Sequence, residues 1–157
     1  MNTKMSFLVM LSSVFALSGL TCPSDCSESN PNPAVDRIDF TLVSTTSATQ
    51  GMVKIDGVVE NKGGGMFDSN PGQQSVQLFE GTTMVAEQIF EDLAPSAMVT
   101  VSFTKNWDTT NEFPPTYRAI IVYDPDIFID GNEGNDDCAT SDNVLERSGT
   151  DINALFP

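Results

Sequence analysis

The chain has 157 residues, with 22 Asp plus Glu, 7 Lys plus Arg and no His, and its formal net charge is −15. A surface of this sign repels phosphate backbones and anionic membranes, so the composition excludes a basic nucleic-acid-binding or lipid-binding face. The lack of His also excludes imidazole general-base catalysis and His metal ligands, which leaves oxygen or sulfur to hold any metal.

Residues 1–21 predict a secretory signal peptide. Lys4 forms the positive n-region, the apolar run 5–17 forms the h-region, and Ser18 and Gly19 provide small residues for cleavage. A permanent membrane helix needs about 20 apolar residues, so this run predicts cleavage and not anchoring, with a retained helix as the alternative. We therefore expect an exported protein that is secreted, periplasmic or held at the cell surface.

The three cysteines, Cys22, Cys26 and Cys138, leave one unpaired in an oxidising compartment. Cys22 follows the apolar run, as the lipid-modified cysteine of a bacterial lipoprotein does, although Thr21 stands where Gly, Ala or Ser is expected. If Cys22 carries a lipid anchor, which would be the contact with the membrane, we expect a disulfide between Cys26 and Cys138. The competing arrangement joins Cys22 to Cys26 and leaves Cys138 as a thiol.

Residues 22–34 are polar and punctuated by proline, which is typical of a flexible tether, and residues 35–145 show strand-like alternation of apolar and polar side chains. No helical period of useful length follows the signal segment. Residues 146–157 are expected to form a C-terminal tail. The predicted strands lie at 38–42, 53–59, 75–80, 84–90, 99–103, 117–123 and 138–145.

Seven short strands separated by turn signals, with a continuous apolar strand second from the end, predict a single antiparallel β-sandwich of the immunoglobulin or fibronectin III type. Tyr117 begins the sixth strand, where a tyrosine corner would place its hydroxyl against the backbone. In this topology the chain start, the turn at 61–70 and the loop after the sixth strand share one end. Residues 46–50 and 106–116 would then face outward at the opposite end.

Six short motifs occur in a fixed order along the chain: Val59-x-Asn61-x-Gly63, Leu78-x-x-Gly81, Leu93-x-Pro95, Val101-x-Phe103, Asp124-Pro125-Asp126 and Asn132-Glu133-x-Asn135-Asp136. With its motifs in this order, the sequence resembles CARDB, the cell-adhesion-related domain found in bacteria, over about residues 35–145. The resemblance implies an immunoglobulin-like sandwich on a surface or extracellular protein, in a binding, adhesive or spacer role. A single copy, Cys138 and the tail depart from the family pattern.

The loop after the sixth strand concentrates side-chain oxygens without a Lys or Arg. Because Ca²⁺ takes six to eight oxygen ligands, this loop predicts a calcium site. The spacing does not fit an EF-hand, since Phe128 stands where Asp or Asn is needed. The alternative is a solvated acidic turn whose side chains cap their own backbone. The predicted ligands are Asp124, Asp126, Asp130, Asn132, Glu133, Asn135 and Asp136.

The remaining features bear on the class of function. Trp107 and Phe113 form either a recognition surface or a loop that covers the core. Paired carboxylates can hydrolyse glycosides, but this loop offers no desolvated partner to raise one pKa, and the chain has no G-x-S-x-G, H-E-x-x-H or P-loop pattern. We therefore predict a non-catalytic module that binds a cell-surface protein or glycan. The alternatives are a spacer without a ligand and a carboxylate-based glycoside-processing enzyme.

Overall fold

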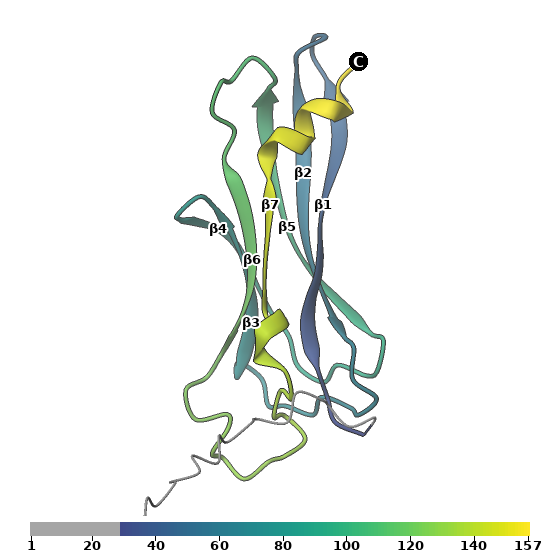
Figure 1. Cartoon of the computed structure of the whole chain (residues 1–157), viewed down its shortest axis with the longest axis vertical. Helices are drawn as coiled ribbons and strands as arrows, with labels where there is room; N and C mark the ends of the chain where they lie inside the picture. The colour runs from purple at the N-terminus through teal and green to yellow at the C-terminus, as the bar shows by residue number, and fades with distance from the viewer. Residues whose placement is uncertain (1–28) are drawn as a thin grey trace, which may run out of the picture.

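The computed structural model describes residues 29–157, which form two antiparallel sheets packed face to face (Figure 1). One sheet has the strand order β1-β2-β5 and the other has the order β4-β3-β6-β7. The predicted signal peptide, Cys22 and Cys26 lie outside the described residues. The strands are β1 (Pro33–Thr45), β2 (Gln50–Asn61), β3 (Gln74–Glu80), β4 (Thr83–Ile89), β5 (Met98–Asp108), β6 (Thr116–Tyr123) and β7 (Val144–Ser148).

This topology confirms the predicted immunoglobulin or fibronectin III-like sandwich of seven strands. The fourth strand, β4, pairs with β3 in the larger sheet, while the smaller sheet contains only β1, β2 and β5. Within residues 29–157 no helix has the length and apolar character needed to cross a membrane.

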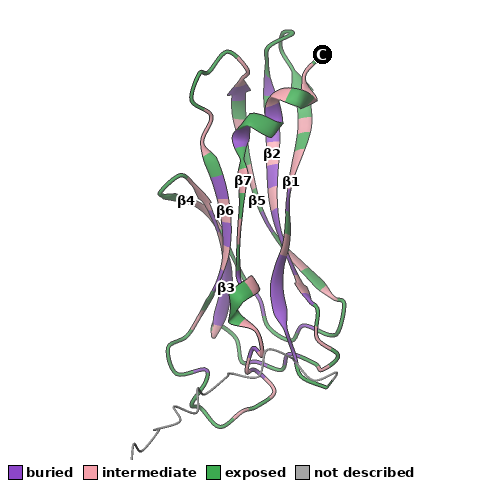
Figure 2. Cartoon of the chain, in the orientation of Figure 1, coloured by how far each residue is buried: buried purple, intermediate pink, exposed green. Residues whose placement is uncertain are grey.

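The core lies between the two sheets, because alternate residues of the central strands point inward (Figure 2). The predicted continuous apolar strand is β6, where Tyr117, Ala119 and Ile121 are buried and Val122, on the other face, is exposed. Full burial of one such aliphatic side chain contributes roughly 1.5–3 kcal/mol. The sheets approach closely at Gly57 of β2, where an added Cβ would lie 3.1 Å from the Cβ of Ala119 on β6.

The last strand differs from its prediction. It was expected at 138–145, but β7 is Val144–Ser148 and follows the short 3-10 helix η1 (Thr140–Asp142). The segment expected as a tail completes β7 and forms a second 3-10 helix, η2 (Gly149–Leu155), whose Ile152 is fully buried. A five-residue strand and a single short 3-10 helix have too few residues to show a period, so the position of this segment depends on the contacts that Ile152, Leu155 and Phe156 make with the core.

The predicted tyrosine corner is wrong. The Tyr117 side chain is fully buried and packs edge-on against Phe40, with 5.5 Å between ring centroids. Its hydroxyl has no hydrogen-bond partner among the described residues. Burial, and then the charge of Glu80, raise the pKa of Tyr117 far above its ordinary value. The ring therefore fills the core because β6 turns it inward, away from the backbone that a tyrosine corner would reach.

Candidate functional site

The strands deliver loops to two opposite ends of the sandwich (Figure 1). We call the end that holds residues 29–32, the connection 62–73 and the loop 124–143 the tether end. Backbone hydrogen bonds join these three segments. Asn32 O accepts from Lys62 N at 2.8 Å, Gly134 O accepts from Asp68 N at 2.9 Å, and Pro31 O accepts from Cys138 N at 3.3 Å. These contacts confirm that the chain start, the turn after β2 and the loop after β6 share one end.

Asn61, from the Val59-x-Asn61-x-Gly63 motif, holds the tether end together. Its Oδ1 accepts from Asn32 N at 2.9 Å and from Gly63 N at 3.0 Å. Its Nδ2 donates to Gly65 O and Leu93 O, each at 2.8 Å. Gly63 and Gly65 must lack side chains, since a Cβ on either would collide with the backbone of residues 29–32. The motif therefore clamps the entering chain onto the sandwich.

The acidic loop folds through its own side chains. Asp130 Oδ1 accepts from Asn132 N at 2.7 Å, and Asp130 Oδ2 accepts from Asn135 Nδ2 at 2.9 Å and from Gln73 Nε2 at 3.1 Å. Asn132 Oδ1 accepts from Gly134 N at 3.0 Å. The hydrogen bonds from Asn135 and Asn132 lower the pKa of Asp130. These contacts have the form of the self-capped turn, the alternative to a metal loop.

The other predicted calcium ligands lie around this turn. Asp124 contacts Asp126 and raises its pKa through a shared hydrogen bond and then through charge. Burial, and then the charges of Asp130 and Glu133, raise the pKa of Asp136. Across residues 29–157, no three acidic or cysteine side chains gather as a metal site would require. Calcium binding by this loop stays a prediction.

Cys138 is disulfide-bonded. Its thiol is therefore not free, which removes the arrangement that pairs Cys22 with Cys26. The other two cysteines of the chain lie outside the described residues, so the pairing of Cys138 with Cys26 stays a prediction. The backbone contact between Cys138 and Pro31 places this disulfide beside the entering chain.

A buried polar cluster behind the acidic loop was missed by the sequence reasoning. Asp137 is buried, and its Oδ2 accepts from the Tyr123 hydroxyl at 3.0 Å and from Asn143 Nδ2 at 2.6 Å. Its Oδ1 accepts from Ala139 N at 3.0 Å. Burial raises the pKa of Asp137 although these three hydrogen bonds lower it. In the sequence, Asp137 is one of several acidic residues close together, and nothing in that pattern distinguishes a buried carboxylate from exposed ones.

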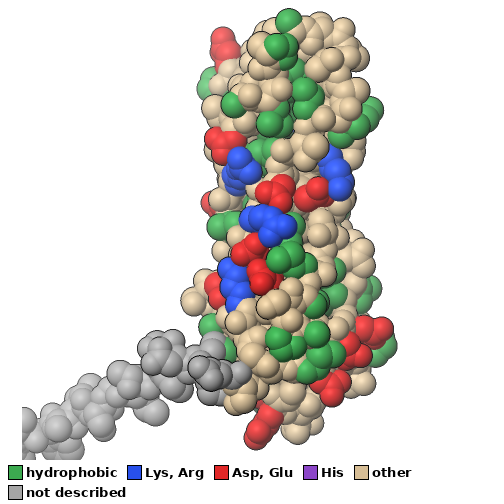
Figure 3. Space-filling model, turned by 90° about the vertical axis from the view of Figure 1, so that its right-hand side faces the viewer, with side chains coloured by type: hydrophobic (Ala, Val, Ile, Leu, Met, Phe, Trp, Pro, Cys, Tyr) green, Lys and Arg blue, Asp and Glu red, His purple; other side chains and the backbone are tan. Residues whose placement is uncertain are grey.

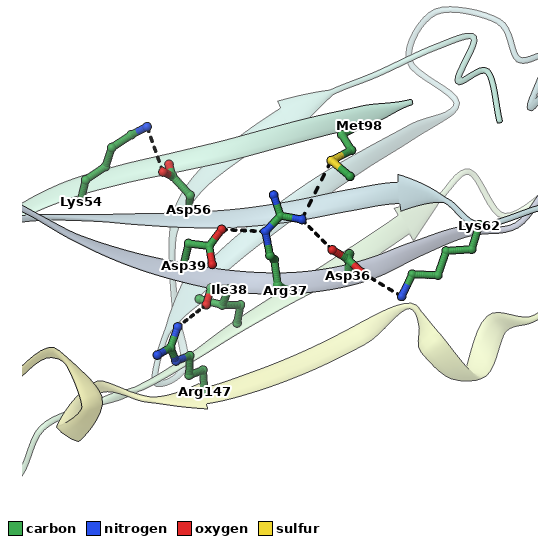
Figure 4. A network of polar contacts seen from close by, with 9 residues as sticks. All are labelled: Asp36, Arg37, Ile38, Asp39, Lys54, Asp56, Lys62, Met98 and Arg147. Atoms are coloured by element: carbon green, nitrogen blue, oxygen red, sulfur yellow. Dashed lines mark hydrogen bonds and ion pairs between the residues drawn. The ribbon is translucent and has the colours of Figure 1, made fainter. Parts of the chain in front are cut away.

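Cations balance acids along the flank, whereas the acids of the loop 124–143 have no such partner within the described residues. On the outer face of β1 and β2, Arg37 pairs with Asp36 and Asp39, while Lys54 pairs with Asp56 (Figure 4). Figure 3 shows the same mixing of Lys and Arg with Asp and Glu over the middle of this face. By contrast, none of the seven acids between residues 124 and 142 forms an ion pair within the described part of the chain. Negative charge without ion-pair partners therefore accumulates on the loop 124–143.

The opposite end, which we call the distal end, carries two adjoining depressions. They have volumes of about 420 and 410 Å³ and share the lining residues Asn106, Trp107 and Asp108 at the end of β5. Trp107 is buried, and its Nε1 donates to Asn153 Oδ1 at 2.8 Å, so its ring covers the core. Phe113 is 83% exposed and lines the second depression. Of the two predicted roles, core covering holds for Trp107, and only Phe113 offers an open aromatic face.

Comparisons of the chain with known proteins do not assign it to a family. No protein-family model matches the chain, and no curated protein matches it. One solved structure is similar, a solution NMR structure of a domain from a Methanosarcina acetivorans protein provisionally named a cell surface protein. It is 18% identical with a TM-score of 0.42, and the match covers 76% of this chain and 90% of that one. A likeness this distant carries no argument, so the resemblance to CARDB stays a prediction.

Proposed function

We propose that the protein is an exported, non-catalytic binding module that is held through its tether end and meets a cell-surface glycan or protein at its distal end. The observation that carries the proposal is the pair of adjoining depressions beside the exposed Phe113. Ligand sites are concave and combine apolar contact surface with a few placed polar groups. The distal end offers this combination on the side away from the entering chain.

The polar groups of the distal end suit a ligand rich in hydroxyls or amides. Gln50 Nε2 donates to Asp108 Oδ2 at 2.7 Å, and Asp108 Oδ1 accepts from Thr110 N and Oγ1 at 2.9 and 2.7 Å. These bonds lower the pKa of Asp108, so it remains an ionised acceptor at neutral pH. Asn106 lies on the rim of both depressions with an exposed amide. An exposed aromatic ring next to fixed acceptors can stack on a sugar or on a peptide side chain.

Three separate features support export. The first is the N-terminal pattern, which predicts a signal peptide. The second is the disulfide of Cys138, because disulfides persist in oxidising compartments. The third is the family resemblance, whose motifs support a surface role. The packing of residues 29–32 onto Gly63 and Gly65 supports attachment through the tether end.

The test is binding of the exported chain to glycan and surface-protein arrays, with Phe113→Ala as the probe variant. Because Phe113 is exposed, this change should leave the thermal midpoint unaltered and remove most binding. Phe128→Ala, an exposed phenylalanine at the tether end, is the matched control and should bind as the parent does. Array signals that survive Phe113→Ala would contradict the distal site, and no reproducible ligand at all would favour the spacer.

A further inference from the structure

Buried oxygens without donors gather at the tether end. Among the described residues, eight buried side-chain polar atoms have no hydrogen-bond partner, and five of them are Oδ1 atoms at the tether end. The Oδ1 atom of an Asn or of an ionised Asp can accept a hydrogen bond but cannot donate one. Such atoms need a water or a cation, because buried polar groups without partners are rare in native proteins. The five residues are Asn32, Asn135, Asp136, Asp142 and Asn143.

Three of the five belong to one linked cluster. Asn32 Nδ2 donates to Asp142 Oδ2 at 3.3 Å, and Asn143, the next residue, uses its Nδ2 on Asp137 at 2.6 Å. Both amide nitrogens are thus directed at carboxylates. Flipping either amide would place its oxygen against a carboxylate oxygen, so the free atoms of Asn32 and Asn143 are the carbonyl oxygens. These two side chains are 9% and 5% exposed.

No cation of the described chain neutralises this cluster. Asp137 is buried and Asp142 is half-buried, and neither forms an ion pair within residues 29–157. Buried carboxylates are normally paired with a cation or coordinate a metal. In the acidic loop, Asp130 already accepts from three donors and the oxygen of Asn132 accepts from Gly134, whereas Asn135 Oδ1 and Asp136 Oδ1 have no donor among the described residues.

We propose that Asn32, Asp142 and Asn143 bind a calcium ion through their free Oδ1 atoms, with Asp137 as the positioning residue that holds Asn143. Carboxylate and amide oxygens are ligands that Ca²⁺ prefers, and backbone carbonyls and water complete its six to eight ligands. With a single carboxylate in direct contact, the site belongs to the weak class found in extracellular modules, with Kd on the order of 10⁻⁴–10⁻³ M.

The ion would join two parts of the chain that are far apart in sequence. Asn32 immediately precedes β1, and its backbone N is held by Asn61. Asp142 ends η1, and Asn143 leads directly into β7. Calcium would therefore fasten the entering chain to the β6–β7 connection, next to the disulfide of Cys138. The attachment of the tether becomes stiffer when calcium is present.

The experiment compares thermal midpoints of the full exported chain in 10 mM CaCl₂ and in EDTA. We expect calcium to raise the midpoint by about 5–10 °C, the shift produced by a ligand at 10 to 100 times its Kd. Asp142→Ala should lose the shift. Asp126→Ala, which removes a carboxylate of the acidic loop, is the matched control and should keep it. If Asp142→Ala does not fold, Asp142→Asn keeps the contact with Asn32 and should weaken calcium binding at least tenfold by calorimetry.

A second signal comes from Tb³⁺, whose emission is sensitised by a nearby tyrosine. Tyr123 contacts Asp137, whereas Trp107 lies at the distal end, so emission excited through tyrosine should appear in the parent and vanish in Asp142→Ala. No midpoint shift and no emission in the parent would mean that water fills the cluster, which overturns the proposal. A shift that is lost in Asp126→Ala would also overturn it, because the ion would then need the acidic loop.

Discussion

Replacing Asn61 with alanine should test whether one side chain holds the tether end together. The residue is fully buried and makes four side-chain hydrogen bonds, to Asn32 N, Gly63 N, Gly65 O and Leu93 O. Alanine removes all four. Water can reach the two glycine partners, whose bonds are part-buried. Leu93 O keeps the hydrogen bond from Phe67 N at 3.0 Å, but Asn32 N stays buried and unpaired.

The magnitude follows from the orphaned Asn32 N and the lost hydrogen bond to Leu93 O. A buried donor left without a partner costs about 1–3 kcal/mol and the loss of an ordinary hydrogen bond about 0.5–1.5 kcal/mol, so Asn61→Ala should lower the free energy of unfolding by about 2–4 kcal/mol. For a domain of this size, a loss near 3 kcal/mol lowers the thermal midpoint by roughly 10 °C. Asn61 is therefore expected to matter as much as a large core residue.

Urea unfolding followed by Trp107 fluorescence provides the assay, because Trp107 is the single tryptophan of the chain and is buried at the far end. A lower urea midpoint with an unchanged slope would show that Asn61→Ala lowers the stability of the whole domain. Asn111→Ala is the control, since the exposed Asn111 caps only Phe113 N at 3.2 Å and should cost about 0.5 kcal/mol or less. If Asn61→Ala cost under 1 kcal/mol, the argument from buried unpaired groups would fail.

Three further predictions concern the core, the C-terminal segment and pH. Gly57→Ala should cost about 1–3 kcal/mol in urea unfolding, because its Cβ would lie 3.1 Å from that of Ala119; a gain in stability would contradict this packing. Ile152→Ala should cost about 2–5 kcal/mol by the same assay, whereas a true tail would show no change. Burial raises the folded-state pKa of Asp137 above its unfolded-state value of about 3.9. Protonation of Asp137 therefore contributes to the free energy of unfolding at pH values below about 3.9. This contribution is lost as the pH rises through the raised folded-state pKa. In EDTA, the stability of the parent relative to Asp137→Asn should therefore fall as the pH rises above about 4, and a flat difference would refute the assigned direction.

The binding proposal and the calcium proposal can fail separately. Phe113 and the two depressions lie at the distal end, while Asn32 and Asp142 lie at the tether end. Loss of array binding in Phe113→Ala leaves the calcium shift intact, and loss of the shift in Asp142→Ala leaves distal binding intact. A variant that loses both has lost the fold, which its urea midpoint would reveal.

Much of the fold was predictable because strand patterns are local. Tyr117, Ala119 and Ile121 alternate with outward residues on β6, and a central strand buries such residues whichever partner it finds. The turn glycines after Asn61 were also visible, since a run of glycines marks a bend. The end of the domain was not visible, because the burial of Ile152 depends on a place in the core that distant strands create.

The sequence by itself determined six of the seven strands, the sandwich class, the shared end of the chain start and the last loop, and the excess of negative charge. Those properties follow from the alternation of apolar and polar residues, from turn residues and from composition. Each of these can be read from short stretches of sequence without knowing which distant segments are in contact. Only the tertiary structure decided which of many Asp and Asn oxygens are buried and lack donors. Asn32 meets Asp142 across 110 positions, and no local pattern encodes a contact of that separation because pairing of the strands must first bring the two segments together.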